Sequence, residues 1–121
     1  MKIERFEDID AWKEARSLVE DVYRIAKNIR DFGFKDQLQR ASISIMSNIA
    51  EGFDRGTNKE FIHFLTIARG SVAEVRSLLY AALDIGYINK VEHEDLLQRS
   101  TTITKMINGF IRYLKKASRQ S

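Results

Sequence analysis

Apolar residues in this chain recur at spacings of three and four, the period of an α-helix that buries one face. Four such stretches follow one another, at about residues 9–30, 35–53, 58–85 and 90–116. None of them alternates with the period of two that is typical of a half-buried strand. The segments between them are short, so successive helices have to reverse direction and pack side by side. The pattern predicts a single all-α domain over residues 1–121, an up-and-down antiparallel four-helix bundle.

Each stretch offers one apolar stripe to a shared core. The expected core positions are Trp12, Ala15, Val19, Val22, Tyr23, Ala26 and Ile29; then Leu38, Ala41, Ile45, Ile49 and Gly52; then Phe61, Phe64, Leu65, Ala68, Val72, Val75, Leu78, Leu79, Ala82 and Ile85; and Leu96, Ser100, Ile103, Ile107, Phe110 and Leu114. Gly70 costs the third helix about 1 kcal/mol relative to alanine. We expect it to allow a neighbouring helix to approach closely.

Residues at the ends of the stretches indicate where the helices begin and end. Asp8 is the expected N-cap of the first helix, and Gly33 is expected to permit the turn that follows it. The runs 57–60 and 89–92 are typical of capping boxes at the third and fourth helices. Gly86 is the expected residue just past the third helix.

A line of polar side chains runs along the second stretch, beside its apolar stripe. Its members are Arg40, Ser44, Asn48, Glu51 and Arg55. One interpretation is that these side chains order the helix against its neighbours within the monomer. The other is a contact with another subunit or a ligand.

Ile43 and Met46 fall outside both stripes and widen the apolar arc beyond what one core needs. Soluble monomers tend to avoid exposed patches of this kind. We therefore expect a homo-oligomer, with the polar line as a rim of the contact. The predicted interface residues are Arg40, Ile43, Met46, Asn48, Glu51 and Arg55.

Bulk composition narrows the class of protein. The chain is 44% hydrophobic and 31% charged, as in soluble globular domains. No apolar run approaches the ~20 residues of a membrane span, and the N-terminal residues lack the apolar segment of a signal peptide. There is no cysteine, which excludes disulfides and thiolate chemistry. We expect a cytoplasmic protein without a membrane association.

Charge is distributed unevenly, because Asp95 is the last acidic residue of the chain. This uneven distribution of charge favours a polyanionic partner, and nucleic acid is the expected one. The predicted contacts are Lys105, Arg112, Lys115, Lys116 and Arg119 on the fourth helix, with Arg69 and Arg76 on the third. A cationic last turn also complements the helix dipole, which accounts for Lys115, Lys116 and Arg119 equally well. Lys105 and Arg112 lie too far from the C-terminus for that explanation.

Catalytic and metal-binding motifs are incomplete. Glu60-x-x-His63 matches half of a di-iron element, which requires two such pairs and two more carboxylates. His63 and His93 begin two antiparallel helices, so they fall at opposite ends of the bundle. Arg55 and His63 are one residue too far apart for the motif of the HEPN ribonucleases. We expect no enzyme activity, catalytic residue, metal, cofactor or small-molecule substrate.

Several runs resemble one protein family. The most specific is Ser47-Asn48-Ile49-Ala50-Glu51-Gly52, with Arg40-Ala41 before it and Arg55 after it; weaker matches are Phe6–Ile9 with Trp12, Lys59–Phe61 with Phe64-Leu65, and Asp84–Ile88. Together they resemble the bacterial 23S rRNA intervening-sequence proteins, also described as a ribosomal protein family. The resemblance implies a four-helix bundle that assembles into a ring, with a pentamer favoured, and an association with rRNA intervening sequences. Accessory proteins of diversity-generating retroelements are related ring-forming bundles that bind nucleic acid.

Two functions from different classes remain open at this point. The first is an oligomer that binds nucleic acid through basic helix faces. The second is a protein–protein interaction scaffold whose basic stripe is only a solvated face. A ribonuclease would require turnover that depends on His63.

Overall fold

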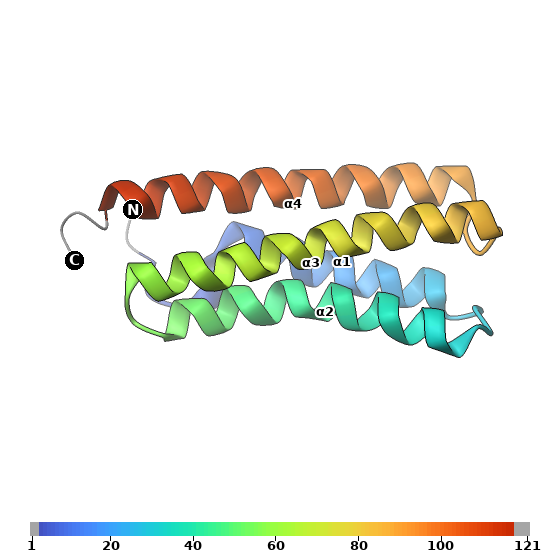
Figure 1. Ribbon diagram of the computed structural model, residues 1–121, viewed down its shortest axis with the longest axis horizontal. Coiled ribbons are helices and arrows are strands. Elements are labelled where there is room, and N and C mark those ends of the chain that lie inside the picture. The colour runs from blue at the N-terminus through green and yellow to red at the C-terminus, as the bar shows by residue number, and fades with distance from the viewer. Residues whose placement is uncertain (1–2, 118–121) are drawn as a thin grey trace.

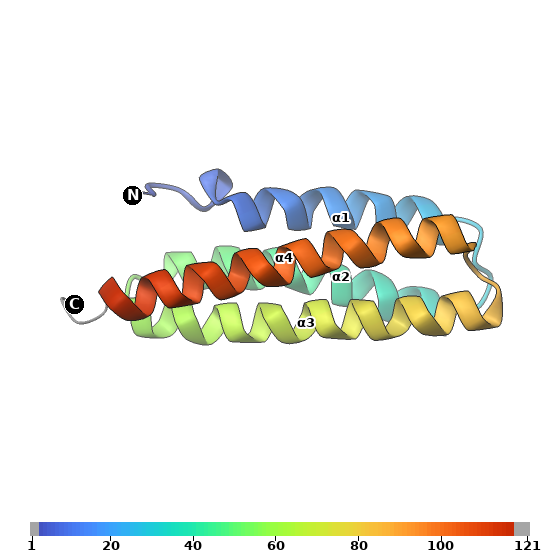
Figure 2. The same ribbon diagram turned by 90° about the horizontal axis from the view of Figure 1, so that it is seen from above.

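Four helices, each antiparallel to the next, account for most of residues 3–117, the part of the chain that the computed structural model describes (Figure 1). They are α1 (Asp10–Ala26), α2 (Phe32–Asp54), α3 (Asn58–Ile85) and α4 (Lys90–Ala117), preceded by a short 3-10 turn, η1 (Phe6–Asp8). Helices that follow one another in sequence pack together, and α1 also packs on α4, so the four surround one core (Figure 2). The predicted all-α up-and-down bundle is confirmed.

The core consists mainly of the predicted stripes, with α2 matching best. Leu38, Ile45 and Ile49 are fully buried there. The prediction was wrong for Tyr23 and Ile85, which are 40% and 57% exposed. Ile85 is the last residue of α3, where the bundle ends and no neighbouring helix covers it. The core also includes residues that were not predicted, Leu18 on α1 and Ile111 on α4.

The first helix is shorter at both ends than the predicted range 9–30. It begins at Asp10, and Asp8 lies in η1 rather than at the N-cap position, which Ile9 occupies without a side-chain cap. The backbone leaves the helix after Ala26, and Ile29 then turns inward until it is 6% exposed. Ile29 is therefore buried as predicted, but from the connection that follows α1 and not from the helix itself.

The second helix begins at Phe32, three residues before the predicted start at 35. The reason is Asp31, whose Oδ1 accepts a hydrogen bond from the Phe34 amide at 3.2 Å and caps the helix. Gly33 therefore lies inside the first turn of α2 instead of forming the preceding connection.

The predicted capping box is half formed at the start of α3 and complete at the start of α4. Thr57 Oγ1 accepts from the Glu60 amide at 3.2 Å at the start of α3. At the start of α4, Asn89 and Glu92 exchange hydrogen bonds of 2.8 and 2.9 Å between side chain and backbone. Such reciprocal bonds satisfy amide groups that the first helical turn leaves unpaired.

The loops at the end of the bundle far from the termini are joined through Tyr87. Gly86 has φ +93°, and the Tyr87 amide donates to the Ala82 carbonyl at 2.8 Å, which closes α3 as predicted. The Tyr87 hydroxyl donates to Asp31 Oδ2 at 2.8 Å, and its ring packs on Phe34. That hydroxyl, followed by the Phe34 amide, lowers the pKa of Asp31.

Close helix approach occurs at Gly52, not at Gly70 as the sequence suggested. A Cβ at Gly52 would lie 2.6 Å from Phe64 Cβ and 3.0 Å from the Phe61 ring. A Cβ at Gly70 would have no neighbour within 4 Å. The absence of a side chain at Gly52 therefore sets how closely α2 and α3 pack.

Candidate nucleic-acid interface

The outer face of α4 carries the strongest candidate site. Lys105, Arg112 and Lys116 are exposed there, opposite the buried residues Ile103 and Ile107. From Lys105 to Lys116 the helix rises roughly 16 Å. Within residues 3–117 none of the three cations forms an ion pair. We call these three residues the α4 basic face.

Two more cations were predicted on α4, of which the structure describes one. Lys115 is exposed and lies about 100° around the helix from Lys116. Arg119 lies outside the described residues. Arg99 binds Asp21 of α1 and donates to Ser17 Oγ at 2.9 Å, so it holds α4 against α1. Burial alone would raise the pKa of Asp21, but Arg99 and then Arg24 hold it below its usual value.

The two predicted cations of α3 lie in the groove between α3 and α4. Arg69 Nη1 donates to Asn108 Oδ1 at 2.7 Å, which joins the two helices. Arg76 is half-buried, and its Nε has no hydrogen-bond partner within the described residues. Tyr80 packs edge-on against His93, with ring centroids 4.7 Å apart. Arg69 and Tyr80 therefore join α3 to α4 and do not continue the α4 basic face.

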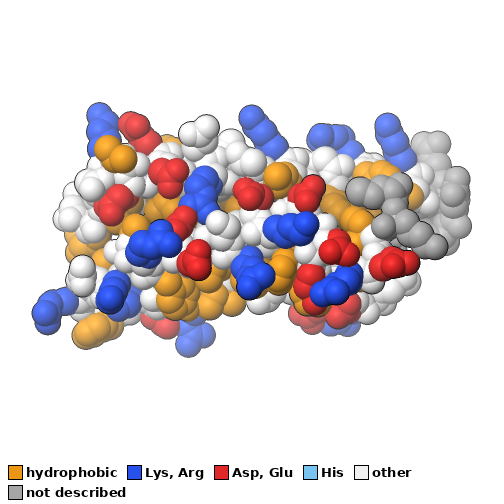
Figure 3. Space-filling view, turned by 180° about the vertical axis from the view of Figure 1, so that it is seen from behind, with side chains coloured by type: hydrophobic (Ala, Val, Ile, Leu, Met, Phe, Trp, Pro, Cys, Tyr) orange, Lys and Arg blue, Asp and Glu red, His pale blue; other side chains and the backbone are white. Residues whose placement is uncertain are grey.

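The charge on the neighbouring helix is different. In Figure 3 Lys and Arg side chains are spaced along the upper edge, over α4, whereas positive and negative side chains are mixed over α1 below it. Hydrophobic side chains gather at the lower left of the same view, and acidic and basic side chains at the lower right. On this face of the molecule the excess of positive charge therefore lies over α4.

Two of the five members of the polar line on α2 form hydrogen bonds inside the monomer that involve Ser44. Ser44 Oγ lies 2.9 Å from Ser71 Oγ on α3, and Asn48 Nδ2 donates to the Ser44 carbonyl at 2.8 Å. Met46 is half-buried and packs against the core, so the prediction that it lies clear of the core is wrong. Its long, flexible side chain reaches the core from a position outside the main stripe.

The other members of the predicted oligomer interface are exposed on α2. Arg40 pairs with Asp36 at 2.8 Å and Arg55 with Glu51 at 3.1 Å. Ile43 is 39% exposed. They are more exposed than Met46 and Asn48, which are half-buried, and all six remain predicted contacts of a neighbouring subunit.

The two histidines do not form a shared site. His63 is exposed near the start of α3, and His93 is 5% exposed near the start of α4, at the opposite end of the bundle (Figure 1). Among residues 3–117 no three His, Cys, Asp or Glu side chains are placed to hold a metal ion together. None of the helices in that range combines the length and apolarity needed to cross a bilayer.

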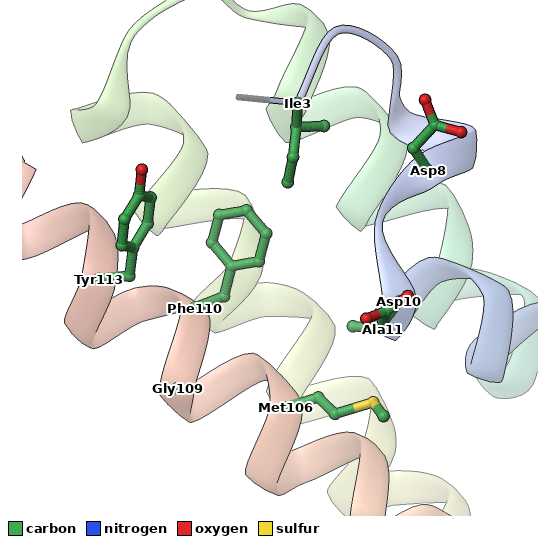
Figure 4. Close-up of a pocket in the computed structure, with 8 residues that line it drawn as sticks. All are labelled: Ile3, Asp8, Asp10, Ala11, Met106, Gly109, Phe110 and Tyr113. Carbon is green, nitrogen blue, oxygen red and sulfur yellow. The ribbon is translucent and has the colours of Figure 1, made fainter. Parts of the chain in front are cut away.

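Sequence reasoning missed two hollows at the end of the bundle where the termini lie. One has a volume of about 290 Å³ and lies between α4 and the start of α1 (Figure 4). The other, about 420 Å³, borders the α2–α3 connection. Ile3, Phe110 and Tyr113 line both. Ile3 precedes every helix, so no helical period could indicate its place beside α4.

Comparison with known proteins places the chain in a family. The family model for 23S rRNA-intervening sequence protein matches residues 7–109. The crystal structure of a protein of unknown function from the S23 ribosomal protein family of Bacteroides thetaiotaomicron superposes with a TM-score of 0.80 at 23% identity, covering 84% of this chain and 97% of that one. No match was found among proteins of curated function. The chain belongs to the 23S rRNA-intervening sequence protein family.

Proposed function

We propose that this protein binds nucleic acid through the α4 basic face and acts by binding rather than by catalysis. One observation carries the proposal: Lys105, Arg112 and Lys116 stand in line on one rigid helix, exposed and without ion-pair partners in residues 3–117. Cations so arranged neutralise phosphates and release counterions, which favours binding without sequence preference.

The position of Lys105 argues against a purely structural explanation. A cation stabilises the helix dipole only within the last turn. Because α4 ends at Ala117, Lys105 lies twelve residues before that end (117 − 105). Lys105 therefore does not stabilise the C-terminal end of the helix dipole. A polyanionic partner accounts for its position better.

The family supports RNA as the class to test first. The description of the family refers to an intervening sequence of 23S rRNA. The related S23 protein of known structure has no known function, so its likeness supports the fold alone. We therefore propose an RNA backbone as the ligand, with DNA as the comparison in the test.

The direct test replaces Lys105, Arg112 and Lys116 with glutamine. Removing three phosphate contacts should weaken RNA binding roughly 10- to 100-fold at ~50 mM salt, for every sequence tried. The matched control replaces Lys13, Lys27 and Arg30 with glutamine. These are exposed cations that precede α2, so the control lowers the net charge by the same amount as the test variant. If both triple variants lose the same affinity, net charge and not the α4 basic face drives binding.

We also propose that the protein forms a closed homo-oligomer, a five-membered ring, in which the outer face of α2 contacts a different surface of the next subunit. Ile43→Glu would place a charge in that contact while leaving the buried stripe of α2 intact. We expect a lower solution mass by light scattering with unchanged helicity. Val91→Glu, at a 76% exposed position on α4, should leave the mass unchanged. A monomeric wild type, or an Ile43→Glu variant of full mass, would exclude this interface.

A further inference from the structure

The smaller hollow lies directly beside the α4 basic face. Its floor is apolar and aromatic, formed by Met106, Phe110 and Tyr113 of α4 together with Ile3 and Ala11 (Figure 4). Phe110 and Tyr113 are edge-to-face, with centroids 6.0 Å apart. At about 290 Å³, the hollow is near the lower end of the ~300–1,000 Å³ range of small-ligand sites.

Gly109 connects the hollow to the basic face. It is one of the lining residues, and a Cβ built on it would lie 3.7 Å from Arg112 Nη2. The Arg112 guanidinium therefore stands at the rim of the hollow, next to a position without a side chain. A ligand could contact this cation and enter the hollow at the same time.

The opposite wall carries negative charge. Asp8 and Asp10 line the hollow on the side of η1 and α1. In Figure 4 the Asp10 carboxylate lies across the hollow from Tyr113, while the Asp8 carboxylate points away. Asp10 Oδ1 lies 4.0 Å from Lys13 Nζ. Because the Asp10 side chain is 84% exposed, its oxygens remain accessible to a ligand. A phosphate would be repelled there, but an amino group would be attracted.

We propose that the hollow takes one unpaired base of a single-stranded RNA whose backbone lies on the α4 basic face. This inference rests on the proposed function and adds the form of the ligand. The outer cations match phosphates, the aromatic floor matches the face of a base, and Asp10 matches an amino group on its edge. This order of charges, positive at the α4 rim and negative on the opposite wall, suits a nucleotide better than a uniformly anionic ligand.

Two preferences follow from this arrangement. A base in a duplex is stacked and paired, so it cannot enter the hollow, and duplex RNA meets only the cations. Cytosine presents an amino group where uracil presents a carbonyl oxygen. The Asp10 carboxylate accepts a hydrogen bond from the former and repels the latter.

The test compares oligo(C), oligo(U) and duplex RNA of equal length against wild type and three variants. We expect wild type to bind oligo(C) about fivefold or more tightly than oligo(U). Gly109→Leu fills the mouth of the hollow without changing charge, so it should lower oligo(C) affinity to that of oligo(U) and leave duplex binding unchanged. Gly70→Leu, on an open part of α3, is the matched control and should change neither.

The third variant, Asp10→Asn, tests the base edge. It removes a negative charge and so raises affinity for all RNA, but the ratio between oligo(C) and oligo(U) should fall toward one. Equal wild-type affinity for the two oligomers, or a Gly109→Leu variant that keeps the ratio, would overturn the base site. In that case the glutamine triple variant still tests the backbone proposal separately. A wild type that binds no RNA at ~50 mM salt would overturn both.

Discussion

Trp12→Ala is expected to lower the free energy of unfolding by roughly 3–5 kcal/mol, because it removes a large buried side chain and leaves a cavity. Trp12 is 9% exposed, and its ring meets Phe6 edge-on at 5.3 Å between centroids. The Arg16 guanidinium lies 5.7 Å from the same ring and would lose its cation–π contact. Chemical denaturation at one fixed subunit concentration measures the loss, since self-association would otherwise shift it.

Tyr23→Ala is the matched control for Trp12→Ala. It also removes an aromatic side chain from α1, but one that is 40% exposed. Its substitution should lower the free energy of unfolding clearly less, by on the order of 1 kcal/mol, because the Tyr23 side chain buries less apolar surface on folding. Equal effects of the two substitutions would show that Trp12 does not anchor α1 to the core.

Gly52→Ala is expected to destabilise the protein by roughly 1–3 kcal/mol, although alanine favours helices over glycine. The new Cβ would lie 2.6 Å from Phe64 Cβ, an atom fixed close to the backbone of α3. The helices can relieve this contact only by moving apart. Thermal and chemical unfolding of the variant measure the change.

Gly70→Ala should have the opposite sign. Nothing lies within 4 Å of a Cβ at this position, so only helix propensity changes and stability should rise by about 1 kcal/mol. A Gly52→Ala variant that is as stable as Gly70→Ala would mean that α2 and α3 do not meet closely at Gly52.

Helical period predicted the architecture because it reports which side of each helix is buried. The buried Leu38, Ile45 and Ile49 follow it without exception. The period does not report which glycine a neighbouring helix approaches, since that depends on the pairing of helices. Gly70 has the more obvious small neighbours in sequence, but Gly52 faces Phe61 and Phe64.

The candidate site, too, could be predicted only where its residues belong to a single helix. Lys105, Arg112 and Lys116 could be predicted because they belong to one helix and share its outer face. The bond from Arg69 to Asn108 could not, because 39 residues separate the partners and their meeting depends on helix pairing. The hollow beside Gly109 depends on Ile3, which no helical pattern includes.

Helix ends were the least accurate part of the prediction. Asp8 and Asp31 are both reasonable caps by residue type. Of these two, Asp31 accepts an amide hydrogen bond at a helix start, whereas Asp8 lies in η1 and leaves the N-cap position of α1 to Ile9. A cap is chosen by tertiary packing as well as by side-chain chemistry.

The most direct test of the central claim is the salt dependence of RNA binding by wild type and by the variant with glutamine at Lys105, Arg112 and Lys116. Affinity is measured from ~50 to ~200 mM salt, and its logarithm is plotted against that of the salt concentration. If the α4 basic face holds the backbone, wild type shows a steep negative slope, and the variant shows a slope shallower by about two to three. Identical slopes, or a wild type without measurable binding at the lowest salt, would contradict the account and favour an interaction scaffold.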